Sequence, residues 1–161
     1  MITEALEGSG RTFGFGHAAH DGEALSWMGE PTLLKATADM TKGLYTLAEI
    51  LATPDGLGPL HVHHREDEAF YLLEGEATFL VGERTIEAGP GTFVFGPRDV
   101  PHRYTIHTPT ARMLMLFSPA GFEGFIRETS QSIDAPPIGP DDIDFDLILA
   151  AAARYGCEVL E

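Results

Sequence analysis

Three histidines and one glutamate have the residue types and the spacing of a metal-binding set. His61 and His63 stand two positions apart in the segment HVHHREDEAFYLLEG, Glu68 follows in the same segment, and His102 ends the later segment GTFVFGPRDVPH. Imidazole nitrogens and a carboxylate oxygen together suit a divalent first-row metal. We therefore expect one divalent transition metal, and Fe, Mn, Ni, Zn and Cu all accept these ligands. In an octahedral site, one or two coordination positions would stay open for water, dioxygen or substrate.

The elements that must position these residues follow a strand-and-turn pattern. Between residues 23 and 117, short apolar runs alternate with glycine and proline turns, which is typical of an all-β sandwich or barrel. His61 and His63 share one face of an expected strand, because side chains alternate along a strand with period 2. No helix is expected between residues 23 and 117. Strands are expected over Ala24–Met28, Thr32–Thr37, Leu44–Ala52, Leu60–His64, Ala69–Leu73, Ala77–Val81, Thr85–Ala88, Thr92–Phe95, Pro101–Thr105 and Ala111–Phe117.

The C-terminal part of the chain has a different texture, and we expect two helices there. Ser118, which is followed by a proline, has the type of an N-cap, so a first helix is expected over Ala120–Ser130. After a proline-rich linker, Asp141 is expected to cap a second helix that runs to about Tyr155 and is ended by Gly156. We divide the chain into an N-terminal arm (1–22), a barrel (23–118) and a C-terminal helical extension (119–161).

Composition limits the class of protein and its partners. With 161 residues, 43% hydrophobic and 22% charged, the chain is the size of one globular domain. A formal net charge of −15 disfavours nucleic acid and anionic membranes as partners. Apolar runs are too short to span a bilayer, and the N-terminus lacks the pattern of a secretory signal. Since Cys157 is the one cysteine, no internal disulfide forms, and we expect a cytoplasmic protein.

The two histidine segments resemble the two motifs of the cupin family. His61-x-His63, four residues, Glu68, six residues and Gly75 follow the first motif. The stretch from Gly91 to His102, which contains a proline at the expected position, is similar to the second motif.

Three departures from these motifs leave every ligand position intact. Gly56 lies one residue closer to the first histidine than usual, Asp99 replaces a glycine, and Ile106 replaces an asparagine. The resemblance covers roughly residues 42–118, and within the family the chain looks like the small single-domain cupins described as quercetin 2,3-dioxygenase-like.

This resemblance implies a fold and a function. The fold would be all-β, a double-stranded β-helix or jelly-roll barrel with two C-terminal helices, and the protein would form a homodimer. His61, His63, Glu68 and His102 would bind the metal. The function would be that of a dioxygenase-like enzyme acting on a small aromatic or enolic compound, with Glu68 both as a ligand and as a catalytic proton acceptor. Two alternatives stay open: a Lewis-acid isomerase or cyclase, and a non-catalytic small-molecule-binding cupin.

Strand alternation also selects candidates for the wall of a substrate pocket. Tyr104 shares the face of His102, and Phe70 and Leu72 share the face of Glu68, so these three side chains are expected to bind substrate. His64 and Glu66 crowd the motif but do not fit its ligand positions. We expect both to be loop or surface residues, with an outer-shell role as the lesser alternative.

Overall fold

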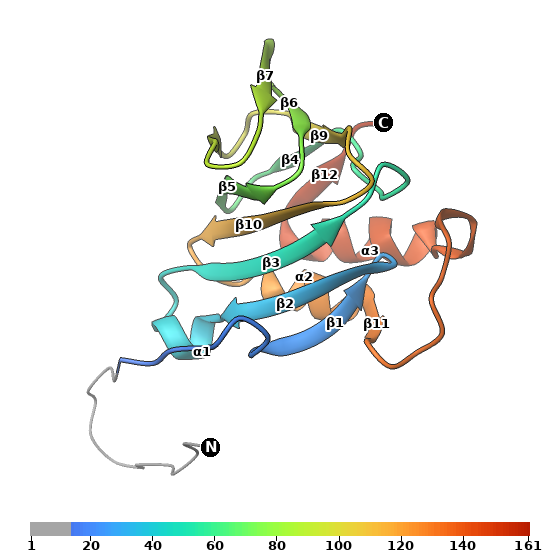
Figure 1. Ribbon diagram of the computed structural model, residues 1–161. Helices are drawn as coiled ribbons and strands as arrows, with labels where there is room; N and C mark the ends of the chain where they lie inside the picture. The colour runs from blue at the N-terminus through green and yellow to red at the C-terminus, as the bar shows by residue number, and fades with distance from the viewer. Residues whose placement is uncertain (1–13) are drawn as a thin grey trace.

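Two antiparallel sheets face each other in the computed structural model, which describes residues 14–161 (Figure 1). The seven-stranded sheet has the order β11-β1-β2-β3-β10-β5-β8, and the five-stranded sheet has the order β12-β4-β9-β6-β7. The expected jelly-roll barrel with C-terminal helices is confirmed. Of the expected arm, the part before residue 14 lies outside the described residues. The strands are β1 Glu23–Trp27, β2 Glu30–Ala36, β3 Thr46–Ala52, β4 His61–His63, β5 Asp67–Glu74, β6 Ala77–Val81, β7 Arg84–Ala88, β8 Phe93–Gly96, β9 His102–Ile106, β10 Ala111–Ser118, β11 Ser130–Ser132 and β12 Cys157–Val159.

Alternation of side chains builds the core between the two sheets. Along β10, every second residue is buried, and these inward residues are Ala111, Met113, Met115 and Phe117. The strand lies between β3 and β5 in the sheet, so its inward side chains meet those of both neighbours. A central strand of this kind anchors β5, which holds one of the expected metal ligands.

The pairing of strands brings the candidate ligands together from both sheets. In the five-stranded sheet, β4 pairs with β9, and His61 lies directly opposite His102. In the seven-stranded sheet, β5 places Glu68 opposite Phe117 of β10 and Gly96 of β8. The carboxylate therefore faces the histidines across the gap between the sheets.

The first C-terminal helix differs from the expectation. Strand β10 continues through Ser118, which pairs with Asp67 of β5, and helix α2 spans only Glu123–Glu128. The expected N-cap was wrong because Ser118 is already held in the sheet ladder. The end of the expected helix is instead strand β11, which pairs with β1.

The second C-terminal helix, α3, spans Phe145–Tyr155 and follows a short 3-10 helix at Pro140–Asp142. Its N-cap is Asp144, which accepts a hydrogen bond from the backbone N–H of Leu147 at 3.0 Å, so the expected cap at Asp141 was wrong. Gly156 ends the helix in the left-handed conformation, as expected. No helix in the described part of the chain has the length and apolar character needed to cross a membrane.

Two further short elements, α1 and β12, were not expected. A single-turn helix, α1, spans Ala38–Thr41, where the carboxylate of Glu123 accepts a hydrogen bond from the N–H of Ala38 at 2.7 Å. After α3, which lies beside β12 (Figure 1), the chain forms this strand. This strand pairs with β4 and places Cys157 opposite His63. The C-terminal segment thus belongs to the wall around the histidines.

Candidate metal centre

The four residues expected to bind a metal converge on one point. Their ligand atoms, one from each of His61, His63, Glu68 and His102, all lie within 4.8 Å of one another. One carboxylate oxygen of Glu68, Oε2, lies 3.7, 3.1 and 2.8 Å from the Nε2 atoms of His61, His63 and His102 respectively. His63, Glu68 and His102 are buried, while His61 is partly exposed. The cluster therefore has one accessible side, at His61.

The second nitrogen of two rings fixes which atom is available to a metal. His61 donates from Nδ1 to the carbonyl oxygen of Pro59 at 2.9 Å, and His102 donates from Nδ1 to that of Val100 at 3.0 Å. A carbonyl oxygen only accepts, so Nδ1 of each ring carries a proton, and Nε2 faces the carboxylate either with a second proton or with a lone pair that can bind a metal. When the rings are neutral, their Nε2 atoms and the carboxylate oxygen are all hydrogen-bond acceptors. They repel one another unless a cation lies between them. The donor set and its orientation therefore fit a divalent metal.

The electrostatics of the cluster favour the same charges. Burial raises the pKa of Glu68, but hydrogen bonds from His102, His61 and His63 outweigh it and hold the pKa well below its usual range. Burial lowers the pKa of His63, yet its interactions with Glu66 and Glu68 outweigh burial and raise the pKa to about 9. The centre thus keeps an ionised carboxylate and attracts positive charge, which protons or a metal ion supply.

Glu66 and His64 both lie in the loop between β4 and β5, as expected, but their environments differ. His64 is exposed, as expected, and its Nδ1 lies 2.7 Å from Asp99. Glu66 is only 4% exposed, and its Oε2 lies 3.5 Å from Nδ1 of His63. The chain bends after β4, so the alternation of the strand no longer says where Glu66 points. In the sequence, only the proximity of Glu66 to the histidine motif suggested that its side chain lies near the metal centre.

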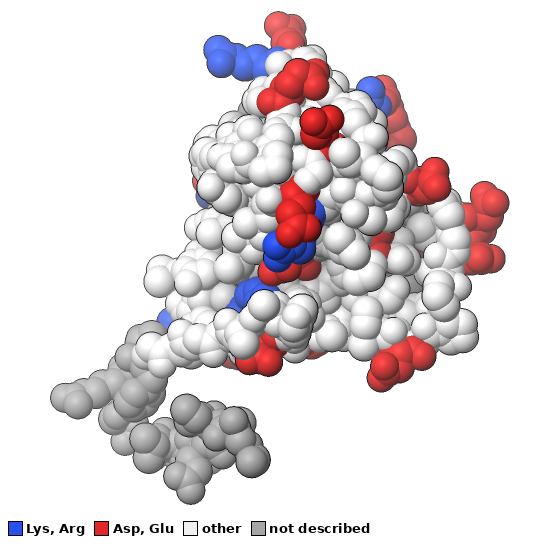
Figure 2. Space-filling view, viewed as in Figure 1, with Lys and Arg blue, Asp and Glu red and all other residues white. Residues whose placement is uncertain are grey.

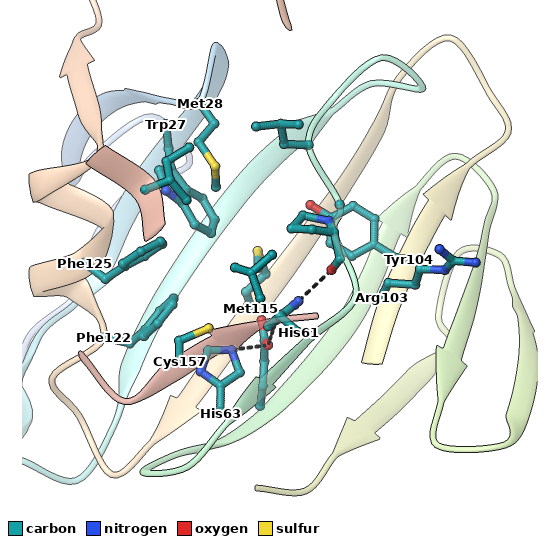
Figure 3. Close-up of a pocket in the computed structure, with 16 residues that line it drawn as sticks. Trp27, Met28, His61, His63, Arg103, Tyr104, Met115, Phe122, Phe125 and Cys157 are labelled. Carbon is teal, nitrogen blue, oxygen red and sulfur yellow. Dashed lines mark hydrogen bonds and ion pairs between the residues drawn. The ribbon is translucent and has the colours of Figure 1, made fainter. Parts of the chain in front are cut away.

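A mostly apolar cavity opens on the metal centre (Figure 3). Its empty volume, including the open mouth, is about 560 Å³. Trp27, Phe122 and Phe125 lie on one side and Tyr104 on the other, with His61 and His63 between them (Figure 3). Ring contacts continue from the wall to the centre, because the ring of Phe122 lies 4.6 Å from that of His63. The lining residues are Trp27, Met28, Leu57, Gly58, Pro59, His61, His63, Glu68, Arg103, Tyr104, Met115, Phe122, Phe125, Ile148, Cys157 and Val159.

The three side chains expected to bind substrate take different places. Tyr104 lines the cavity. Phe70 and Leu72 are buried and are not among the lining residues, and the Phe70 ring packs 4.9 Å from that of Phe79 and 6.1 Å from that of His102. Phe70 thus contacts the metal centre from behind, as part of the core. A direct role of these residues in substrate binding stays a prediction.

Sequence reasoning missed the wall that faces Tyr104. This wall comes from β1, α2, α3 and β12, which lie far from the histidine motifs along the chain. No residue pattern marks such a wall, since Trp27, Phe122 and Phe125 have the character of ordinary core residues. Knowledge of how the C-terminal segment folds back onto the barrel was needed to place them.

Two polar groups of the cavity wall, the thiol of Cys157 and the hydroxyl of Tyr104, keep their protons. Burial raises the pKa of the Cys157 thiol to about 12, and the charges of Glu68 and Glu66 add to this effect. Burial, with the charges of Glu30 and Glu68, likewise raises the pKa of the Tyr104 hydroxyl above its ordinary value. Both groups therefore keep their protons and act as hydrogen-bond donors rather than as nucleophiles.

Comparisons with known proteins agree with this architecture. The family model described as "Cupin domain" matches residues 49–118. Quercetin 2,3-dioxygenase of Bacillus subtilis is 31% identical over 103 residues, which are 63% of this chain but only 31% of that enzyme. The uncharacterised protein SCO3923 of Streptomyces coelicolor is 31% identical over 102 residues, which cover 63% of this chain and 85% of that protein.

A solved structure supports the fold. An RmlC-like cupin from Shewanella frigidimarina has a TM-score of 0.59 at 19% identity, over 70% of this chain and 96% of that chain. The match to the dioxygenase spans less than a third of that enzyme, so it concerns one region only. The region matched by the family model holds all four residues of the metal centre, and this chain belongs to the cupin superfamily.

Proposed function

We propose that this cupin is a metal-dependent, dioxygenase-like enzyme that acts on a small aromatic or enolic compound. The observation that carries the proposal is the apolar cavity that meets the metal centre at His61, His63 and Glu68. A flat, mostly apolar substrate would bury its surface against this wall and direct one oxygen at the metal. The regional similarity to quercetin 2,3-dioxygenase adds support for this reaction class.

The protein groups at the centre have separable tasks. A bound divalent metal would act as a Lewis acid and acidify an enol or phenol group of the substrate. Glu68 lines the cavity beside the histidines, and its carboxylate would accept the proton of that hydroxyl. Trp27 and Phe122 would stack on the rings of the substrate and keep water from the reacting atoms.

The cavity contains its own spectroscopic probe. Trp27 is the one tryptophan of the chain, and it lines the cavity with its ring nitrogen donating to the hydroxyl of Thr129 at 2.9 Å. A ligand that enters the cavity therefore changes the tryptophan fluorescence. Binding can be measured in this way without turnover.

The test combines metal content, binding and oxygen uptake. Protein loaded anaerobically with Fe²⁺, Mn²⁺, Ni²⁺, Cu²⁺ or Zn²⁺ is titrated with a flavonol while Trp27 fluorescence is recorded, and oxygen consumption is then followed. We expect one metal per chain, quenching on binding, and oxygen uptake in proportion to substrate consumed. His102→Ala should weaken metal binding by more than the roughly 10–100-fold that loss of an outer-shell partner causes. The matched control His107→Ala, which changes an exposed histidine beyond β9, should not.

Each alternative function gives a different result in this test. Conversion of substrate without oxygen uptake would assign the site to a Lewis-acid isomerase or cyclase. Fluorescence quenching without any conversion would identify a binding protein. Either result contradicts the dioxygenase-like proposal.

A further inference from the structure

Two buried polar atoms beside the metal centre have no hydrogen-bond partner, and each is the nearest candidate for the other. These atoms are Nδ1 of His63 and Oε2 of Glu66, which lie 3.5 Å apart. The side chains are only 1% and 5% exposed. A buried polar atom without a partner is costly, so an arrangement that closes this gap is favoured.

His63 differs from the other two histidines in what its second nitrogen faces. His61 and His102 donate to neutral backbone carbonyls, whereas Nδ1 of His63 faces a carboxylate. A carboxylate behind a metal-bound imidazole orients the ring and makes it a stronger donor to the metal. The three imidazoles are therefore unequal, and the difference resides in Glu66.

Aromatic side chains pack against the ring of His63, and its Nδ1 edge faces Glu66. The ring of Phe122 lies 4.6 Å away and is inclined by 78°, and the ring of Phe117 lies 5.7 Å away and is inclined by 62°. These contacts restrict the plane of the imidazole. A hydrogen bond at Nδ1 would fix its remaining rotation and aim Nε2 at the metal.

Charge balance also favours Glu66 as a partner of the metal. Glu68 supplies one negative charge to the buried cluster, and a divalent ion brings two positive charges. An ionised Glu66 would make the buried set neutral, which removes the penalty for a net charge in a region of low dielectric constant.

We propose that Glu66 is a positioning residue of the metal centre, which accepts a hydrogen bond from Nδ1–H of His63 and so makes His63 the strongest imidazole ligand. The proposal rests on the metal site of the proposed function, but it does not depend on the reaction. Its test therefore measures the metal and the hydrogen bond rather than turnover.

The experiment compares Glu66→Gln with the wild type and with Glu83→Gln, the same chemical change in the turn between β6 and β7, away from the centre. Co²⁺ affinity is measured by competition with a chelator, and the ligand-field absorption of the Co²⁺-loaded protein is recorded. We expect Glu66→Gln to lower the affinity roughly 10–100-fold and to shift the absorption bands. Glu83→Gln should leave both unchanged.

A second measurement needs no variant. In the Zn²⁺-loaded wild type, proton–nitrogen NMR of the histidine side chains should show a downfield Nδ1 proton on His63, distinct from those of His61 and His102. Its absence, or Glu66→Gln protein with wild-type affinity and spectrum, would overturn the proposal. A variant that changes only thermal stability would also overturn it, since Glu66 would then be a structural residue.

The outcomes separate this inference from the proposed function. If the protein binds Co²⁺ and Glu66→Gln weakens the binding, but no oxygen is consumed, Glu66 keeps its role and the dioxygenase-like reaction fails. If oxygen is consumed while Glu66→Gln binds metal normally, the reaction stands and the role of Glu66 fails. A wild type that binds no metal contradicts both.

Discussion

Buried glutamates have distinct environments in this small barrel. Glu68 faces three histidines and Glu66 faces one of them. Glu123 accepts hydrogen bonds from the N–H groups of Ala38 and Gly121, and so ties α1 to the chain before α2. Among the described residues the buried glutamates are Glu30, Glu66, Glu68 and Glu123.

Glu30 forms hydrogen bonds with the start of the loop that begins at Thr53 and forms part of the cavity wall. Its Oε1 accepts from the N–H of Thr53 at 2.7 Å and from the hydroxyl of Thr53 at 3.3 Å. Gly56 passes so close to Glu30 that a Cβ atom there would clash with the same oxygen. The loop continues into Leu57, which lines the cavity. Burial raises the pKa of Glu30 to about 7, against the opposing effect of the hydrogen bonds from Thr53.

The raised pKa of Glu30 predicts a pH-dependent stability. Between the unfolded value of 4.5 and the folded value of about 7, the native state binds more protons than the unfolded state. The free energy of unfolding therefore falls as pH rises through this window, by at most about 3 kcal/mol. Glu30→Gln removes this contribution. In urea unfolding at pH 5, 6, 7 and 8, the stability of the wild type minus that of the variant should decrease with pH. A difference that does not change with pH would contradict the assigned pKa.

At the scale of elements, the junction between α3 and β12 supports the metal centre. Gly156 has φ of 69°, and its carbonyl oxygen accepts from the N–H of His64 at 2.8 Å. The next residue, Cys157, pairs with His63. The strand that carries two candidate metal ligands is therefore held from its outer edge by the C-terminal segment.

Gly156→Ala tests this junction. An alanine in the left-handed conformation costs roughly 1–2 kcal/mol, and its Cβ would lie 2.8 Å from Nε of Arg65, whose flexible side chain can move. We expect the free energy of unfolding in urea to fall by about 1–2 kcal/mol. The matched control is Gly89→Ala, because no atom lies within 4 Å of a Cβ there. If both variants had the same free energy of unfolding, a side chain at position 156 would not strain the junction.

The cluster of candidate ligands and the barrel could be predicted from the sequence because both depend on local patterns. Alternation predicted ten strands within two residues of their bounds, and the spacing of His61, His63 and Glu68 identified the centre. Strands β11 and β12 have three residues each, so their structure depends on the partners β1 and β4 rather than on their own pattern. The position of Glu66 depends on a bend, and the apolar wall depends on the packing of α2 and α3. These features are tertiary.

At the scale of the whole molecule, charge and apolar surface are unevenly distributed. The net charge is −15, and Figure 2 shows separate acidic side chains with broad uncharged areas between them. Three exposed aromatic residues, Tyr71, Phe93 and Phe95, lie on β5 and β8, and Tyr71 pairs with Phe93. Strand β8 is the edge of the seven-stranded sheet as described for residues 14–161, and it contains no charged residue. No charged side chain of β8 would therefore repel a second copy of the chain at this edge.

We expect a second copy of this chain to cover the β8 edge and form a homodimer. Antiparallel pairing of two β8 strands about a two-fold axis would satisfy their free backbone groups and join both aromatic patches. Each patch exposes on the order of 300 Å², enough for the centre of an interface of about 800 Å² per partner. Sedimentation should give twice the chain mass of 17.4 kDa for the wild type. Phe93→Asp should sediment with the mass of one chain, because the two-fold axis would bring two buried charges together. The control Phe145→Asp, the same change on the exposed side of α3, should remain dimeric. A monomeric wild type, or a dimeric Phe93→Asp variant with intact metal binding, would exclude this edge as the interface.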